Sequence, residues 1–233
     1  MNLLSKIQGN EKMEENYEYM LRGMAHELNN PLSGIKGAAQ LLSSKLSSEE
    51  VNKCSDIIIK EVDRLKSLID RLRRLDSFER ESFEPVNIHE ILLDIIFLES
   101  NLHDYINFDT KFDITIPPVS GDQTSLKQVF INIIKNAIDS IGKEGSIEIK
   151  TKWVTDYKIK SKNNIEITIK DNGQGIQRKN LKKIFTPFFS NKKGGSGLGL
   201  FISNQIIAKH GGVIMVESEI KKGTKFKIHL PVN

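Results

Sequence analysis

Apolar residues recur at helical spacing along the first third of the chain. Between residues 13 and 46 they follow one another at intervals of three or four, which places them on one stripe of a helix wound at about 100° per residue. From Val51 onward, a second set recurs at near-heptad spacing. The first stripe comprises Tyr17, Leu21, Met24, Leu28, Leu32, Ile35, Ala39, Leu42 and Leu46, and the second comprises Cys54, Ile58, Val62, Leu65, Leu68, Ile69, Leu72 and Leu75.

These two segments predict a hairpin of long amphipathic helices. Ser47 and Ser48 interrupt the first pattern and precede two glutamates, an order typical of a helix N-terminus. Pro31 lies inside the first helix and should bend it, and the polar residues 1–12 are expected to fray or to continue from an upstream helix. Because a lone hairpin covers both stripes poorly, a second copy should complete a four-helix bundle, and we expect a homodimer.

Beyond this hairpin the apolar spacing alternates between helix-like and strand-like. The helical pattern lapses near Glu79 and Pro85 ends any helix, so a linker is expected there. The following pattern predicts a helix over 88–98, a strand over 106–116, a helix over 124–141, paired strands over 146–154 and 165–171, a helical turn over 181–185, a helix over 197–210 and a hairpin of strands 213–217 and 224–230. This order predicts a two-layer α/β sandwich. We therefore expect a helical hairpin domain over 13–82 and an α/β sandwich domain over 87–233.

Composition narrows the classes of function. Charged residues make up 27% and hydrophobic residues 38% of the 233 residues, as in ordinary soluble proteins, and the net charge is only +4. No basic block interleaved with aromatic residues suggests nucleic-acid binding. The single cysteine, Cys54, excludes an internal disulfide and a multi-cysteine zinc site. No run approaches the roughly 18 apolar residues of a membrane span, so we expect a cytoplasmic protein or the cytoplasmic piece of a longer one, without a membrane segment.

His26 is the first candidate for chemistry. It points about 165° away from the centre of the apolar stripe and should face solvent. Asn30 shares its face of the helix, and Glu27 is the next residue round. An imidazole that is largely neutral at cellular pH offers a nitrogen lone pair as a nucleophile. A lone histidine in this place would equally be a solvated surface group, and the second half of the chain changes that interpretation.

Asn132, Asn136 and Asp139 cluster on the polar side of the predicted helix 124–141. Amide oxygens on a helix that faces a cleft suit a hard cation such as Mg2+, which keeps several waters and bridges substrate phosphates. Alone, the pattern also fits a solvated helix face.

Glycines follow two of the predicted elements. After the strand that ends at Lys170, D-N-G-Q-G-I places Asp171 where it can accept a hydrogen bond from an exocyclic amine such as that of adenine, with Gly173 and Gly175 allowing close approach of a base. Alone, this fits an Asn-Gly hairpin turn. Further on, G-G-S-G-L-G-L over residues 194–200 opens onto a helix, where backbone N–H groups favour phosphate.

Taken together, these motifs resemble a known family. H-E-L-N-N-P-L is similar to the phosphoacceptor box of two-component sensor histidine kinases, and N-I-I-K-N-A-I-D-S to their N box. D-N-G-Q-G-I, F-T-P-F-F-S and G-S-G-L-G-L resemble the first glycine box, the F box and the second glycine box of their Bergerat-type ATP-binding domain, a fold shared with DNA gyrase and MutL proteins. The resemblance covers residues 15–233 and is strongest to nitrogen-regulation-type sensor kinases. We expect these residues to lack the N-terminal sensor domain that such kinases usually carry.

The resemblance implies a set of nucleotide contacts. Asp171 would hold the adenine amine of ATP, Asn136 would hold Mg2+ with help from Asn132, and Lys135 would reach phosphate. Residues 176–196 would form a lid with glycine hinges, and Lys192 would either neutralise the γ-phosphate or lie free in solvent. The full set of residues implied to bind the nucleotide is Asn132, Lys135, Asn136, Asp139, Asp171, Gly173, Gly175, Ile176, Lys192, Gly195, Gly197, Leu198, Gly199 and Leu200.

The resemblance also implies a reaction. His26 would attack the γ-phosphoryl group in line, with Glu27 orienting the other ring proton, and the phosphoryl group would pass to an aspartate of a response regulator. Asn30 would orient a water for dephosphorylation of that regulator. Two alternatives remain open, a Bergerat-type ATPase that only hydrolyses ATP and a dimeric scaffold that binds without catalysis.

Overall fold

The structure is a computed structural model that describes residues 28–42, 47–76, 83–155, 163–192 and 196–232. The chain divides into two compact units, residues 1–80 with 186–198 and residues 81–185 with 199–233. The predictions made for His26, Glu27 and Gly195 lie outside the described residues.

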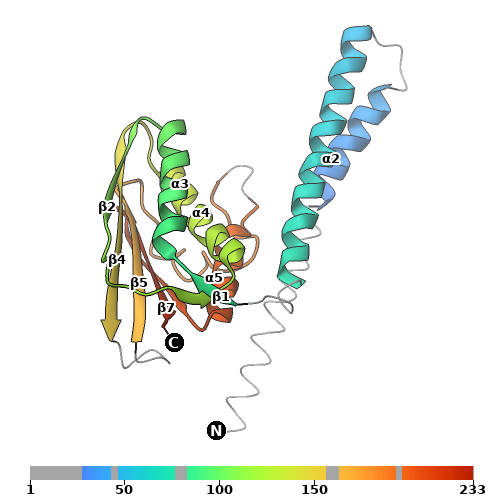
Figure 1. The fold of residues 1–233 in the computed structure, drawn as a ribbon. Helices are drawn as coiled ribbons and strands as arrows, with labels where there is room; N and C mark the ends of the chain where they lie inside the picture. Colours follow the sequence, from blue (N-terminus) through green and yellow to red (C-terminus); the bar gives the residue numbers. More distant parts are fainter. Residues whose placement is uncertain (1–27, 43–46, 77–82, 156–162, 193–195, 233) are drawn as a thin grey trace. The chain divides into compact units, whose positions relative to one another are not determined.

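The first unit contains the predicted pair of helices. Residues 28–42 are helical and run alongside α2 (Ser48–Asp76), as Figure 1 shows. The N-terminus of α2 is fixed by a capping box, because the Ser47 amide donates to Glu50 Oε2 at 2.9 Å and the Glu50 amide donates to Ser47 Oγ at 3.4 Å. This confirms the predicted helix start at the two serines.

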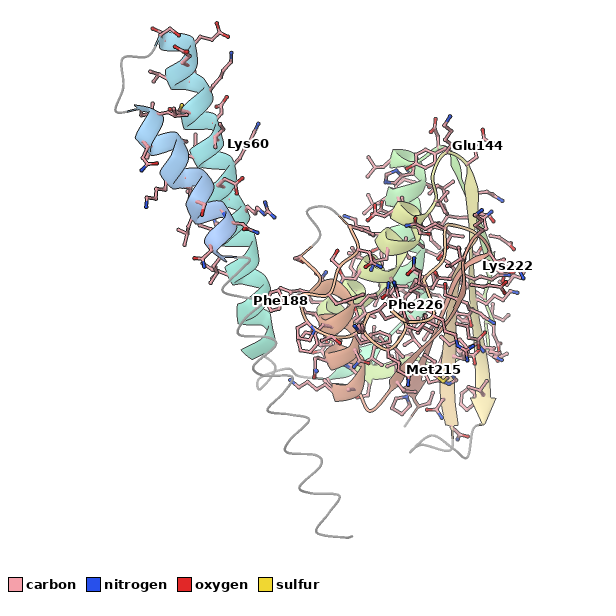
Figure 2. The ribbon with its side chains drawn as sticks, turned by 180° about the vertical axis from the view of Figure 1, so that it is seen from behind. Lys60, Glu144, Phe188, Met215, Lys222 and Phe226 are labelled. Carbon is pink, nitrogen blue, oxygen red and sulfur yellow. The ribbon has the colours of Figure 1, made fainter. Side chains whose placement is uncertain are left out.

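The two helices bury only part of their apolar stripes against each other. Ala38 and Cys54 are 4% and 6% exposed. Leu32, Val62 and Ile69 keep exposed fractions of 51%, 48% and 48%. Polar side chains such as Lys60 project from the outer side of α2 (Figure 2). A single hairpin therefore leaves much of the predicted stripes in water.

The second unit is built on a five-stranded sheet in the order β2-β4-β5-β7-β6. The strands are β2 (Ile106–Lys111), β4 (Gly145–Thr155), β5 (Asn163–Asp171), β6 (Val213–Glu219) and β7 (Gly223–Pro231). The pair β2 and β4 is parallel, and the other pairs are antiparallel. Helices α3 (Ile88–Leu102), α4 (Gln123–Ser140) and α5 (Gly199–Lys209) lie on one face of the sheet (Figure 1). The predicted two-layer α/β sandwich is confirmed.

Alternate residues of the strands form the core between the sheet and the helices. Ile147, Ile167 and Ile228 are fully buried, as is Phe130 of α4, and Phe226 of β7 lies among them in the interior (Figure 2). Each large apolar side chain that is withdrawn from water stabilises the fold by about 1.5–3 kcal/mol. The opposite face of the sheet is charged, and Glu217 there has its pKa lowered to about 2 by hydrogen bonds from Lys225 and Lys227.

Several elements differ from the sequence predictions, and α3 runs to Leu102 rather than ending at residue 98. The last helix begins at Gly199 rather than at residue 197, because Gly197 has a φ of +63°, which a right-handed helix cannot contain. The strand predicted over 106–116 ends at Lys111, since the Thr115 amide folds back to Asp113 Oδ1 at 3.0 Å. A small antiparallel pair, β1 (Glu84–Val86) with β3 (Val119–Gly121), was not predicted. Pro85 is tolerated in β1 because this strand lies at a sheet edge.

No helix within the described ranges is both long enough and apolar enough to cross a membrane.

Candidate functional site

The candidate nucleotide site is organised around Asp171, the last residue of β5. Its side chain is 3% exposed, and its Oδ1 accepts hydrogen bonds from Ser140 Oγ at 2.9 Å, from the Gly173 amide at 2.8 Å and from the Thr224 amide at 3.2 Å. Burial raises the pKa of Asp171 above its ordinary value, and the hydrogen bonds oppose that shift. Because the three donors share one oxygen, the carboxylate has a fixed orientation, and Oδ2 keeps lone pairs for a ligand.

Gly173 and Gly175 are required by contacts within the protein. A Cβ on Gly173 would collide with the hydroxyl and carbonyl oxygens of Ser140. Gly175 has a φ of +72°, and a Cβ there would collide with the carbonyl oxygen of Glu219. The first glycine box therefore packs its backbone against the end of α4 and the turn between β6 and β7. These contacts require glycine at both positions, independently of the predicted close approach of a base.

Asn132 and Asn136 lie one turn apart on α4 and are both half-buried. Asn132 Nδ2 donates to the carbonyl oxygen of Gly199 at 3.2 Å and lies 3.3 Å from Ser203 Oγ, while its Oδ1 accepts from Gln128 at 2.9 Å. Asn132 thus ties α4 to the first turn of α5. One turn beyond Asn136, Ser140 reaches Asp171, so the polar side of α4 faces the candidate site.

The remaining polar residues of α4 are more exposed. Lys135 is 61% exposed, and its Nζ lies 3.9 Å from Glu99 Oε1 on α3. Asp139 is exposed as well. The lysine therefore reaches toward α3 in this structure, with its stem free enough to change direction.

In the second glycine box, the structure describes residues 196–200. Leu198 is fully buried, Gly199 begins α5 and Leu200 is half-buried. A Cβ on Gly197 would collide with the backbone of Phe188 and Phe189. Earlier in the chain, the Ile176 amide donates to Ser218 Oγ at 2.8 Å. Lys192 is exposed.

Sequence reasoning missed two residues of the Asp171 cluster. Ser140 stands four residues after Asn136, so the spacing of 132, 136 and 140 indicated its place on the same helix face. Thr224 is supplied by the start of β7, and only the pairing of β5 with β7 brings its amide to Asp171.

The side chains of this site suit a cation only when a substrate supplies further ligands. Within the described ranges, no group of three His, Cys, Asp or Glu side chains could hold a metal ion. The amide side chains of Asn132 and Asn136 suit Mg2+, which commonly takes one or two protein ligands and completes its shell with waters and substrate phosphates.

Two family profiles match the sequence. The one described as "His Kinase A (phospho-acceptor) domain" matches residues 17–81, and the one described as "Histidine kinase-, DNA gyrase B-, and HSP90-like ATPase" matches residues 121–233. The sensory histidine kinase/phosphatase NtrB of Rhodobacter capsulatus is 35% identical over 224 residues, which cover 91% of this chain and 61% of that protein. Sporulation kinase A of Bacillus subtilis is 36% identical over 90% of this chain and 34% of its own length.

The chain thus spans between about a third and three fifths of the length of these relatives. Solved structures agree with this match. The catalytic domain of histidine kinase ThkA is 31% identical, with a TM-score of 0.56 over 65% of this chain and 96% of that domain. ThkA in complex with the response regulator protein TrrA is 27% identical, with a TM-score of 0.69 over 100% of this chain and 68% of that chain.

Proposed function

The chain belongs to the sensor histidine kinase family, and from that premise we propose that it transfers the γ-phosphoryl group of ATP to His26 and then to an aspartate of a response regulator. The observation that carries the proposal is the buried Asp171, whose carboxylate is held in one orientation by donors from α4, β7 and its own loop. A buried acceptor held in one orientation is suited to recognising the amine of adenine.

The nucleotide would lie against α4 and the first turn of α5. Asp171 Oδ2 accepts a hydrogen bond from the adenine amine. The backbone N–H groups at Gly199 and Leu200 face the phosphates at the N-terminus of α5. Asn136, with Asn132 beside it, would hold Mg2+, which would supply positive charge to neutralise the phosphates. Lys135 can leave Glu99 for a phosphate, and Lys192 adds a positive charge on the segment that follows the first glycine box. The glycines at 194, 195 and 197 would be the hinges of that segment.

His26 acts as the nucleophile because it is predicted to face solvent on its helix. Its ring nitrogen forms a bond to the γ-phosphorus while the bond from that phosphorus to the leaving oxygen breaks, which yields phosphohistidine and ADP. Glu27 accepts the hydrogen bond of the other ring nitrogen and favours the reactive tautomer. Most of the acceleration comes from positioning and charge neutralisation.

The helical hairpin forms the dimer and the docking site for the regulator. The half-exposed Leu32, Val62 and Ile69 support a four-helix bundle, because a second copy would cover the stripes that one hairpin leaves open. The complex of the similar kinase ThkA with TrrA supports a response regulator as the partner.

The test is incubation of the intact chain with γ-labelled ATP and Mg2+. A kinase acquires label that is lost in acid and kept in base, as expected for a phosphoramidate. Release of labelled phosphate without any labelled protein would instead indicate a Bergerat-type ATPase, and binding without turnover would indicate a scaffold.

Asn30→Ala is expected to slow dephosphorylation of the phosphorylated regulator about 100-fold, in the range of a lost water-orienting group. Asn30 is exposed on the helix over 28–42, where its side chain can reach a docked regulator. Labelling of His26 should stay near the wild-type rate. Asn29→Ala, at the exposed neighbouring position, is the control for helix propensity. Unchanged phosphatase activity in the Asn30 variant would remove this role.

A further inference from the structure

His210 follows α5 directly, is 5% exposed, and has both ring nitrogens engaged. Its Nδ1 lies 2.8 Å from the carbonyl oxygen of Ile206, and because a carbonyl only accepts, Nδ1 carries the proton. Its Nε2 lies 3.0 Å from the backbone nitrogen of Asp122, whose N–H donates, so Nε2 is the acceptor. The ring is therefore held as one neutral tautomer.

The bond to Asp122 matters because Asp122 caps α4. Its Oδ1 accepts from the Ser125 amide at 2.6 Å, while its own amide is taken up by His210. The preceding residue must be Gly121, since a Cβ there would lie 2.7 Å from His210 Cδ2. One buried ring thus joins the end of α5 to the start of α4.

A second bond joins the same helices at the other end of α5. Asn132 donates from α4 to the carbonyl oxygen of Gly199, the first residue of α5. The two helices are therefore fastened at both ends of α5. They also carry Asn136 and Leu200, which the proposed function assigns to the nucleotide, so their spacing determines whether those residues reach it together.

Phe83 stacks on the imidazole ring of His210. Its ring lies 4.6 Å from that of His210, centroid to centroid, with an angle of 15° between the planes. Phe83 directly precedes β1, and the next residue, Glu84, pairs with Gly121. Phe83, which lies next to the start of β1, thus packs on the ring that joins α4 to α5.

We propose that His210 is a positioning residue for nucleotide binding, and that the stacking of Phe83 on its ring helps to set how α4 lies against α5. This rests on the proposed nucleotide site but not on phosphoryl transfer. Loss of the Phe83 ring would let the imidazole shift against Asp122, and the nucleotide affinity would change. The stack thus couples Phe83 to the nucleotide site.

The test measures the dissociation constant of a non-hydrolysable ATP analogue for the intact chain by calorimetry. Phe83→Leu removes the stacked ring but keeps an apolar cover, and it should weaken binding about 2- to 30-fold, the range for residues that couple to a distant site. Phe83→Tyr keeps the ring and should bind like the unchanged chain. Phe97→Leu makes the same change at a 69% exposed position on α3 and should have no effect.

His210 variants provide the second arm. Gln places an oxygen near the position of Nε2 and can still accept from Asp122, whereas Asn is too short, so His210→Asn should bind the analogue more weakly than His210→Gln. Adding Phe83→Leu to His210→Gln should change little, because no imidazole remains to stack on. Should the His210 variants not fold, the Phe83 series carries the test alone.

The inference is overturned if Phe83→Leu binds the analogue as tightly as Phe97→Leu, or if its effect is the same in the presence and absence of the imidazole. A lowered melting temperature with unchanged affinity would likewise reduce the stack to a structural role. Labelling of His26 could persist in each of these cases, so the proposed kinase activity would stand. If the unchanged chain bound no analogue, the proposed function would fail and this inference with it.

Discussion

His26→Gln is expected to abolish the transfer of label from γ-labelled ATP to the protein. Glutamine is polar and of similar length but offers no basic nitrogen, so the bond to phosphorus cannot form. The substitution lies on a predicted solvent face, and the affinity for an ATP analogue should therefore not change. The loss should be complete in the acid-labile, base-stable label, rather than a fractional decrease.

The environments of the other four histidines help to identify the labelled residue. His210 and His229 are buried, and His89 is stacked on Phe112 and hydrogen-bonded to Thr151. His103 has a side chain that is 30% exposed, which makes His103→Gln the matched control, and it should label normally. Label that persists in His26→Gln would assign the phosphoryl group to another residue.

Asp171→Asn is expected to weaken ATP binding by about 10- to 150-fold, the worth of a hydrogen bond to a charged group. Asn can keep an oxygen at the position of Oδ1 for its three donors, but it places an NH2 group opposite the amine of adenine. Two donors then face each other. Calorimetric titration with an ATP analogue measures the effect, and a titration with a guanine nucleotide tests whether recognition of the base has changed. Wild-type affinity in this variant would refute the assigned adenine contact.

The same substitution should stabilise the nucleotide-free protein at neutral pH. Burial raises the folded-state pKa of Asp171, so the unfolded chain releases this proton at lower pH than the folded chain does. Asp171 does not destabilise the fold below its unfolded-state pKa. The free energy of unfolding then decreases as the pH rises through the folded-state pKa of Asp171. At neutral pH, Asp171→Asn avoids the buried charge, and the gain in melting temperature should disappear below about pH 4, where the acid is protonated in both states. A lower melting temperature at pH 7 would mean that the charge-assisted hydrogen bonds outweigh burial.

Local patterns in the sequence predicted the existence of several helices and strands. The apolar spacing and the serines at 47 and 48 predicted the second helix, and the capping box between Ser47 and Glu50 shows why it begins there. The alternation over 146–154 and 165–171 likewise predicted paired strands, and β4 and β5 form that pair in the antiparallel direction. Each of these signals depends on residues that are close in the chain, where helix and strand periodicity can be read directly.

The sequence by itself determined the family, because the order of its boxes is restrictive, and from the family it predicted roles for Asp171 and Asn136. Only the tertiary structure decided what holds them. Ser140 and Thr224 converge on Asp171 across 31 and 53 positions, and His210 reaches Asp122 across 88. Such contacts follow from the strand order and from the packing of helices on one face of the sheet, and no local periodicity encodes which distant donors will meet a buried acceptor.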